Sequence, residues 1–220
     1  MFGYNSLFSG QMLYENYIYQ MYNITMTSIP IMWFAIYDLE FEKDRPKGSN
    51  DDSKDSKYLL RNPILYKIGM NNECFSLNKL FVWIFYAVYH AAIVYVANLY
   101  VLMQSDAIQS DGKDIGFWSA GHSVYGSCIF IVNTLLVLRF STHTVPGIFF
   151  FFLMYAAYFV LFSIESQFKS IHVIYGLVGN TLGSELVWLA MIFCTVTVLL
   201  PELVVKYIQI INYSAQNRKY

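Results

Sequence analysis

Four residues with hydrogen-bonding side chains, followed by a proline, recur along an apolar segment near the start of the chain. They are Asn16, Gln20, Asn23, Thr27 and Pro30, spaced four, three, four and three residues apart. At about 100° per residue, a helix brings all five within roughly 40° of Asn16 on one narrow face. Polar groups at membrane depth are costly unless they pair or line a wet cavity. Proline also frees a backbone carbonyl. The pattern therefore favours a path for a polar group.

The chemistry of this polar line is neutral, because no Asp or Glu occurs from Asn16 through Tyr37. A proton relay or a divalent-cation site needs charged oxygen ligands. Amides and hydroxyls suit a polar or zwitterionic group instead. For any one of these residues, hydrogen bonding between packed helices is the plainer interpretation. Four polar residues on one face, followed by a proline, favour a substrate path, and we predict neither a catalytic residue nor a metal site.

The elements that must position this line are membrane helices. The chain has 220 residues, 56% of them hydrophobic and 13% charged, against about 25% charged in soluble domains. A bilayer core needs roughly 20 apolar residues per helix. The sequence predicts an all-α membrane protein with about five transmembrane helices, at Leu13–Tyr37, Leu80–Met103, Phe117–Leu138, Val145–Ile164 and Leu186–Ile211.

The basic residues predict the orientation of these helices, because Lys and Arg collect on the cytoplasmic side. Twelve of the 14 fall on one side of the predicted helices, and only Lys113 and Lys169 fall on the other. The N-terminus is therefore expected outside or in the lumen, and the C-terminus in the cytoplasm. An outside N-terminus without a basic leader segment suggests that Met1 is not the natural start.

The remaining segments and side chains are expected to play supporting roles. The stretch 42–57 is charged and free of apolar residues, so we expect a disordered cytoplasmic insertion. The three cysteines are scattered and show no metal or redox spacing. No basic patch indicates nucleic acid. His90 is interpreted as a packed histidine, and His122 and Asn133 as interhelical hydrogen-bonding groups. Glu202 is expected to pair with Lys206 one turn later, as a helix anchor.

A set of motifs carries a resemblance to a known family. In chain order they are Phe8-Ser9-Gly10-Gln11, Tyr22-Asn23, Thr27-Ser28-Ile29-Pro30, Tyr37-Asp38, the stretch NPILYKIG and Leu200-Pro201-Glu202. In this order and spacing they resemble the last five membrane helices of the type IV P-type ATPases, the phospholipid flippases. Met26, Ile29 and Glu202 replace the family's usual Phe, Leu and Asp.

The resemblance implies that the chain is the C-terminal membrane domain, residues 1–220, of a phospholipid-translocating ATPase. Such a protein moves phospholipids from the outer or luminal leaflet to the cytoplasmic leaflet. Aligned on the proline, Asn23 keeps an Asn that is an ion ligand in cation pumps, and Thr27 takes the place of an Asp. A neutral residue there is what a lipid carrier shows. Asn23 and Thr27 are then the central candidates, with Gln20 and Asn16 nearer the outer leaflet.

The same resemblance implies functions that this chain cannot supply alone. The phosphorylated Asp motif and the nucleotide-binding domain are missing from the sequence, so the chain is expected to be a fragment that binds no cofactor. ATP and Mg²⁺ would belong to the parent enzyme. The family also implies an accessory glycosylated β-subunit, contacted through Gln104–Gly116 and Glu165–Ser184. The implied location is the plasma membrane, Golgi or endosomal membranes.

Two other hypotheses remain open at this stage. The chain could be a five-helix membrane scaffold or passive lipid scramblase that uses no ATP. It could also be the C-terminal part of a cation pump, although the missing carboxylates in the first helix argue against that function.

Overall fold

The computed structural model describes residues 2–38, 67, 70–71, 75–103, 112, 114–140, 144–169 and 174–217, with the side chains of 209 and 212–217 excepted. The predicted insertion at 42–57 and most of NPILYKIG lie outside these residues. The chain divides into two compact units, one of Met1–Asp38 with Ala92–Tyr220 and one of Leu39–Ala91. Each unit is described by itself.

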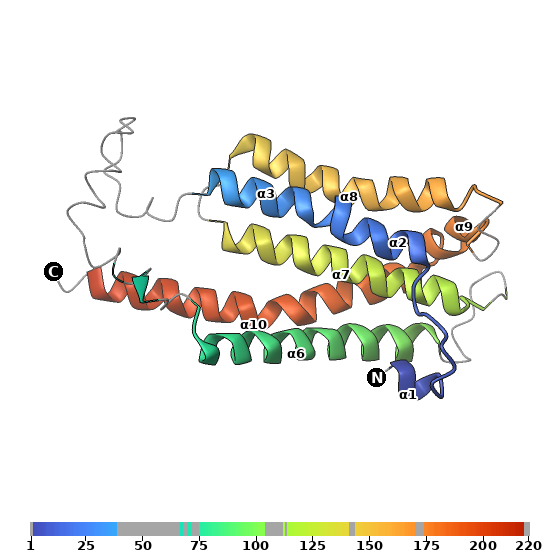
Figure 1. Ribbon diagram of the computed structural model, residues 1–220, viewed down its shortest axis with the longest axis horizontal. Helices are drawn as coiled ribbons and strands as arrows, with labels where there is room; N and C mark the ends of the chain where they lie inside the picture. The colour runs from blue at the N-terminus through green and yellow to red at the C-terminus, as the bar shows by residue number, and fades with distance from the viewer. Residues whose placement is uncertain are drawn as a thin grey trace. The chain divides into compact units, whose positions relative to one another are not determined.

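Every regular element in the described residues is a helix (Figure 1), which confirms the predicted all-α class. In chain order they are α1 (Phe2–Asn5), α2 (Asn16–Met21), the π-helix η1 (Tyr22–Met26), α3 (Ser28–Tyr37), α6 (Leu77–Leu102), α7 (Phe117–Arg139), α8 (Val145–Glu165), α9 (Leu177–Leu182) and α10 (Glu185–Asn217).

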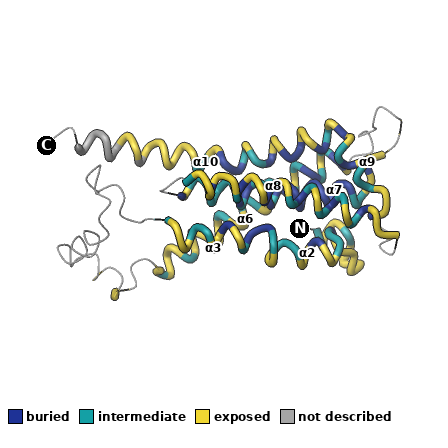
Figure 2. The backbone as a smooth tube through the Cα atoms, turned by 90° about the horizontal axis from the view of Figure 1, so that it is seen from above, coloured by how far each residue is buried: buried dark blue, intermediate teal, exposed yellow. Residues whose placement is uncertain are grey.

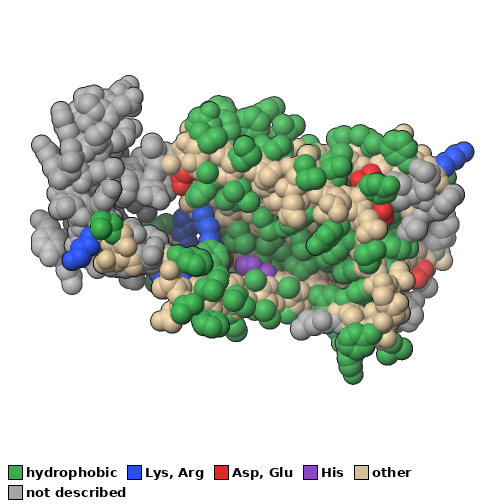
Figure 3. Space-filling model, viewed as in Figure 1, with side chains coloured by type: hydrophobic (Ala, Val, Ile, Leu, Met, Phe, Trp, Pro, Cys, Tyr) green, Lys and Arg blue, Asp and Glu red, His purple; other side chains and the backbone are tan. Residues whose placement is uncertain are grey.

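Four helices within the described residues are long and apolar enough to cross a membrane, by length and composition. These spans are Leu77–Leu102, Phe117–Arg139, Val145–Glu165 and Glu185–Ile208. The fifth predicted span, Leu13–Tyr37, divides into α2, η1 and α3, and none of these pieces is long enough to count alone. Hydrophobic side chains dominate the face seen in Figure 3, as expected of a surface that meets lipid.

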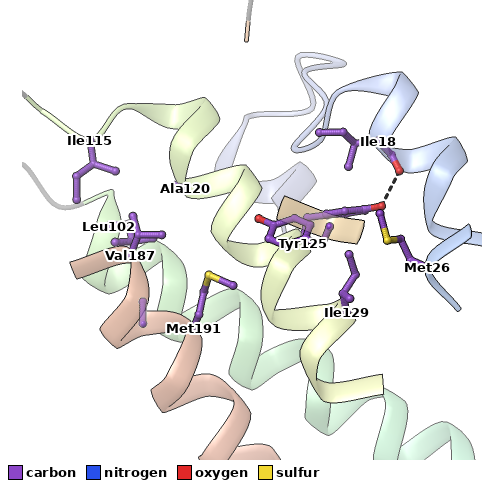
Figure 4. Close-up of a cluster of buried hydrophobic side chains, with 11 residues drawn as sticks. Ile18, Met26, Leu102, Ile115, Ala120, Tyr125, Ile129, Val187 and Met191 are labelled. Carbon is purple, nitrogen blue, oxygen red and sulfur yellow. Dashed lines mark hydrogen bonds between the residues drawn. The ribbon is translucent and has the colours of Figure 1, made fainter. Parts of the chain in front are cut away.

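Helix α7 is the centre of the first unit. Of its most apolar stretch, 56% is buried, compared with 28% for α8 and 33% for α10. Helices α3, α8, α9 and α10 all pack against it, and the buried positions concentrate along it in Figure 2. The core around α7 includes Ile18 and Met26 from one side and Val187 and Met191 of α10 from the other (Figure 4).

Two glycines let other parts of the chain approach α7 closely. A Cβ on Gly121 would lie 2.3 Å from the carbonyl oxygen of Leu13. A Cβ on Gly126 would lie 2.6 Å from Cε of Met191 and 2.8 Å from the hydroxyl of Tyr158. Side chains at these positions would force the neighbouring elements apart. Gly121 therefore allows the segment before α2 to lie directly on α7, and Gly126 allows side chains of α8 and α10 to do so.

Local sequence signals explain how α8 begins beside this core. Thr144 is the N-cap, and its hydroxyl accepts a hydrogen bond from the backbone N–H of Gly147 at 3.4 Å. Pro146 lies in the first turn, where its missing N–H costs little.

The second unit is described mainly through the first part of α6, up to Ala91. His90 lies there between two aromatic rings, with ring centroids 6.1 Å from Tyr86 and 5.8 Å from Tyr89. This environment agrees with the interpretation of His90 as a packed histidine.

Candidate functional site

The segment that carries the polar line is a broken helix. Helix α2 ends at Met21, η1 covers Tyr22–Met26, and α3 begins only at Ser28. Thr27 lies between them with φ −121° and ψ −29°, outside the α-helical range. Its backbone N–H donates to the carbonyl of Tyr22, five residues back, at 3.2 Å. A turn of π-helix takes in an extra residue, and such turns are frequent at functional sites.

Hydroxyl side chains around the break compete for its backbone carbonyls. The hydroxyl of Thr27 donates to the carbonyl of Tyr22 at 3.0 Å, and that of Thr25 donates to the carbonyl of Met21 at 2.9 Å. The hydroxyl of Ser28 donates to the carbonyl of Ile24 at 2.5 Å. Hydroxyls that bond back to their own helix weaken it locally. The Thr25–Ser28 sequence therefore favours an irregular turn here.

Helix α7 supplies one hydrogen-bond donor to α2 and one to the last residue of η1, both ahead of Thr27. The hydroxyl of Tyr125 donates to the carbonyl of Ile18 at 2.8 Å, the bond drawn in Figure 4. The amide nitrogen of Asn133 donates to the carbonyl of Met26 at 3.3 Å. Pro30 has no N–H, so the usual donor to that carbonyl four residues earlier is absent. We call these two hydrogen bonds the α7 contacts.

The structure separates the five predicted site residues into two groups. Asn16, Gln20 and Asn23 are exposed on α2 and η1. Thr27 and Pro30 are buried, and Thr27 is 7% exposed. The single face expected from a continuous helix is interrupted because the π-turn changes the rotation per residue. The segment therefore has three exposed amides, followed along the chain by a buried turn.

The exposed amides lie beside apolar side chains that also face outward. Tyr17, Tyr19 and Ile24 are 59%, 60% and 64% exposed. Primary amides both donate and accept hydrogen bonds, so they can contact an anionic oxygen as well as an ammonium or hydroxyl. At the start of α2, a carboxylate oxygen of Glu15 accepts from the backbone N–H of Tyr17 at 2.6 Å and caps the helix. This surface can bind a polar group while apolar chains lie alongside it.

Two residues of α7, Asn133 and His122, were expected to form hydrogen bonds between helices, and only Asn133 does. Asn133 does so through Met26, as described above. His122 instead stacks on Phe162 of α8, with ring centroids 4.0 Å apart and planes inclined by 27°. Within the described residues, neither ring nitrogen of His122 has a hydrogen-bond partner. Its expected interhelical hydrogen bond is therefore replaced by aromatic packing.

A second buried polar cluster joins α6, α7 and α10, and sequence reasoning did not identify it. Asn98 is fully buried, and its amide nitrogen donates to the carbonyl of Val94 at 2.8 Å and to Sγ of Cys194 at 3.2 Å. The hydroxyl of Ser123 donates to the amide oxygen of Asn98 at 2.6 Å. Because this amide is well supplied with partners, we assign the cluster to helix packing.

The end of α7 is joined to the middle of α10 by contacts that differ from the expectation. Glu202 pairs with Arg139 of α7, nitrogen to oxygen 3.3 Å, rather than with Lys206. Lys206 donates to the carbonyl of Leu138 in the last turn of α7. Both contacts fix α10 to α7, so the interpretation of Glu202 as an anchor agrees with the structure, while its predicted partner was wrong.

Comparison with known proteins places this geometry in context. The family described as "Phospholipid-translocating P-type ATPase C-terminal" matches residues 1–214. The chain is 28% identical over 210 residues to phospholipid-transporting ATPase DRS2 of Saccharomyces cerevisiae, covering 91% of this chain and 14% of that protein. It is 25% identical over 220 residues to human phospholipid-transporting ATPase ID, covering 95% of this chain and 17% of that protein.

A third relative gives the same result. Human phospholipid-transporting ATPase IG is 27% identical over 200 residues, covering 89% of this chain and 16% of that protein. The chain therefore spans about a sixth of the length of these relatives.

Proposed function

The chain belongs to the phospholipid-translocating P-type ATPases, whose C-terminal region it matches over residues 1–214, and from this premise we propose that it forms part of a lipid path. Family membership and the four apolar helices make it an integral membrane protein. The observation that supports the proposed path is the broken segment α2–η1–α3, with three exposed amides ahead of a buried turn.

In this proposal, α2, η1 and α3 together cross the bilayer as the fifth span. Asn16 to Tyr37 covers about 33 Å at 1.5 Å per residue, and a bilayer core is about 30 Å thick. The N-terminus of the segment lies outside or in the lumen, and its C-terminal end lies at the cytoplasmic side, in keeping with the basic residues.

The exposed amides of Asn16, Gln20 and Asn23 bind the phospholipid headgroup in turn, and the acyl chains remain in the bilayer beside Tyr17 and Ile24. Neutral amides release such a group more readily than a fixed charge would, because charged contacts are the stronger ones. Thr27 and Pro30 shape the turn at the inner end of this row. The direction of movement is from the outer or luminal leaflet to the cytoplasmic leaflet.

ATP hydrolysis belongs, in this proposal, to other parts of the complete protein. Within the described residues there is no group of three or more His, Cys, Asp or Glu side chains that could bind a metal ion. We therefore assign no described residue to Mg²⁺ or ATP and derive no step through them. The accessory β-subunit is proposed to contact the loops Gln104–Gly116 and Glu165–Ser184, in plasma, Golgi or endosomal membranes.

The test is transport of a fluorescent phospholipid by the complete protein in vesicles, with and without ATP. Asn23→Ala should lower lipid transport and lipid-stimulated ATP hydrolysis together. Asn78→Ala is the matched control, because Asn78 is also an exposed amide but lies in the first turn of α6. Unchanged rates for Asn23→Ala would remove Asn23 from the path. Wild-type transport that proceeds equally without ATP would favour a passive scramblase.

A further inference from the structure

The carbonyl of Met26 is a special acceptor in this fold. In a regular helix it would accept the N–H of residue 30, but residue 30 is proline. Met26 is 2% exposed, so water does not readily replace the missing donor. A buried carbonyl without a donor is unfavourable. Asn133 supplies that donor from a different helix, at 3.3 Å.

Asn133 itself is an unusual residue for a packed helix face. It is fully buried, with 0% of its surface exposed. Within the described residues, its amide oxygen has no hydrogen-bond partner, although its amide nitrogen has Met26. A buried amide that is only half satisfied is less favourable than an apolar side chain of similar size, unless its donor is needed. The group that needs this donor is the backbone carbonyl of Met26.

The two α7 contacts bracket the part of the segment that carries the proposed headgroup ligands. Tyr125 binds the carbonyl of Ile18, and Asn133 binds that of Met26. The two donors are eight residues apart on α7, and the two acceptors are eight residues apart on the broken segment. Gln20 and Asn23 lie between the two bound carbonyls. Helix α7 is continuous through this region. It therefore provides a continuous helix to which the irregular turn is hydrogen-bonded at both of these carbonyls.

We propose that Asn133 is a positioning residue of the lipid path: its amide replaces the donor that Pro30 lacks and fixes the inner end of η1 to α7. The proposal rests on the proposed function for its link to transport, while the link between Asn133 and Pro30 is a property of the structure alone. Loss of the amide frees the turn, and Gln20 and Asn23 lose their fixed spacing.

The pairing of Asn133 with a proline makes a specific test available. Pro30→Ala restores an N–H that can donate to Met26 within the helix, which makes the Asn133 amide dispensable. An ordinary interhelical hydrogen bond would not depend on residue 30. Asn98→Leu is the matched control, because Asn98 is an equally buried amide whose partners are Val94, Ser123 and Cys194.

The first measurement is lipid-stimulated ATP hydrolysis of the complete protein as a function of phospholipid concentration. Asn133→Leu should raise the apparent KM for lipid about tenfold, the upper range for one hydrogen bond, with kcat changed less than about twofold. In the Pro30→Ala background the same substitution should raise KM less than about twofold. Asn98→Leu should show the same effect in both backgrounds. An equal effect of Asn133→Leu in both backgrounds would overturn the inference.

The second measurement is hydrogen exchange of the complete protein in lipid nanodiscs, followed over the peptides of this segment, which separates the inference from the proposed function. Asn133→Leu should speed exchange of the amides of residues 22–29 about fivefold or more, and Pro30→Ala should reverse this. Unaltered exchange contradicts the inference even when transport is confirmed. The predicted exchange pattern without any lipid-stimulated hydrolysis contradicts the function and retains the structural role.

A smaller substitution covers the case in which Asn133→Leu fails to fold. Asn133→Ser ends one bond short of the position of the amide nitrogen, and its hydroxyl can bond back to its own helix. We expect the same rise in exchange, and the same reversal by Pro30→Ala. A serine variant with wild-type exchange would refute the role of the amide.

Discussion

Among the described helices, Pro146 only starts α8, while Pro30 and Pro201 lie further along their apolar segments, and only the segment of Pro30 is broken. Pro201 lies inside α10, which continues as one helix from Glu185 to Asn217. Around Pro30 the chain forms a π-turn and restarts as α3. The difference lies in the surroundings. Pro30 follows the hydroxyl residues Thr25, Thr27 and Ser28, whose side chains bind backbone carbonyls, and it lies opposite donors from α7.

The comparison shows that a proline removes one hydrogen bond but does not by itself decide the shape of the chain. At Pro30 the freed carbonyl is bound by Asn133, so the irregular form is stabilised from outside. The break is therefore a feature of packing as much as of local sequence. The four predictions below test this difference, from the largest expected effect to the smallest.

The largest effect is expected where the segment before α2 touches α7. Gly121→Ala places a Cβ 2.3 Å from the carbonyl of Leu13 and should force the two apart. We expect a loss of about 2–3 kcal/mol in the free energy of unfolding, typical of overpacking. Thermal unfolding in detergent measures it. Gly179→Ala is the control, because nothing lies within 4 Å of its Cβ position, and equal losses would contradict the predicted contact.

The two prolines should differ in their effect on transport. Pro30→Ala restores the helical hydrogen bond at the break and should straighten the turn, so lipid transport should fall about tenfold, or roughly 1.4 kcal/mol. Pro201→Ala in the continuous helix should change transport less than about twofold. Rates of phospholipid uptake by reconstituted vesicles compare them. Equal effects would mean that the break has no special role.

The outer α7 contact should contribute a moderate amount of stability. Tyr125→Phe removes the hydroxyl that donates to the carbonyl of Ile18, which keeps its bond from the N–H of Tyr22. We expect a loss of about 1 kcal/mol, the usual net value of one hydrogen bond. Tyr175→Phe, at a tyrosine that is 52% exposed, is the matched control and should be nearly neutral. A stability unchanged by Tyr125→Phe would show that this contact is not used.

The smallest effect is expected at the ion pair between the end of α7 and the middle of α10. The side chains of Arg139 and Glu202 are 40% and 21% exposed, so solvent screens their attraction. Arg139→Ala should lower the free energy of unfolding by about 0.5 kcal/mol at most. The difference should shrink further in high salt, where surface charges are screened. A loss that grows with salt would contradict an ion pair and indicate packing of the arginine stem.

Sequence reasoning reached the class of fold and the family because both depend on long, repeated signals. Long runs of apolar residues predict membrane helices, and the described residues contain four helices long and apolar enough to cross a membrane. The ordered motifs from Phe8 to Glu202 indicated the family that the comparison confirms. Pro30 indicated a freed backbone carbonyl, but Leu13–Tyr37 was still predicted as one helix.

The details of the site depended on contacts that are distant in sequence. A regular rotation of 100° per residue cannot reveal a π-turn, which is stabilised here by Tyr125 and Asn133, each 107 residues away from its partner. The partner of Glu202 was missed for the same reason, since Arg139 is 63 residues away while Lys206 lies one turn along. Local spacing finds neighbours on one helix, and packing between helices decides among them.

The central claim is that the exposed amides of the broken segment contact phospholipid during transport. The most direct measurement is photo-cross-linking of a labelled phospholipid to the complete protein, with a photoreactive residue at position 23. A matched probe at position 193 replaces Phe193, which is 58% exposed on α10. The account predicts capture at 23 that changes when ATP is added and capture at 193 that does not. Capture that is equally insensitive to ATP at both positions would contradict it.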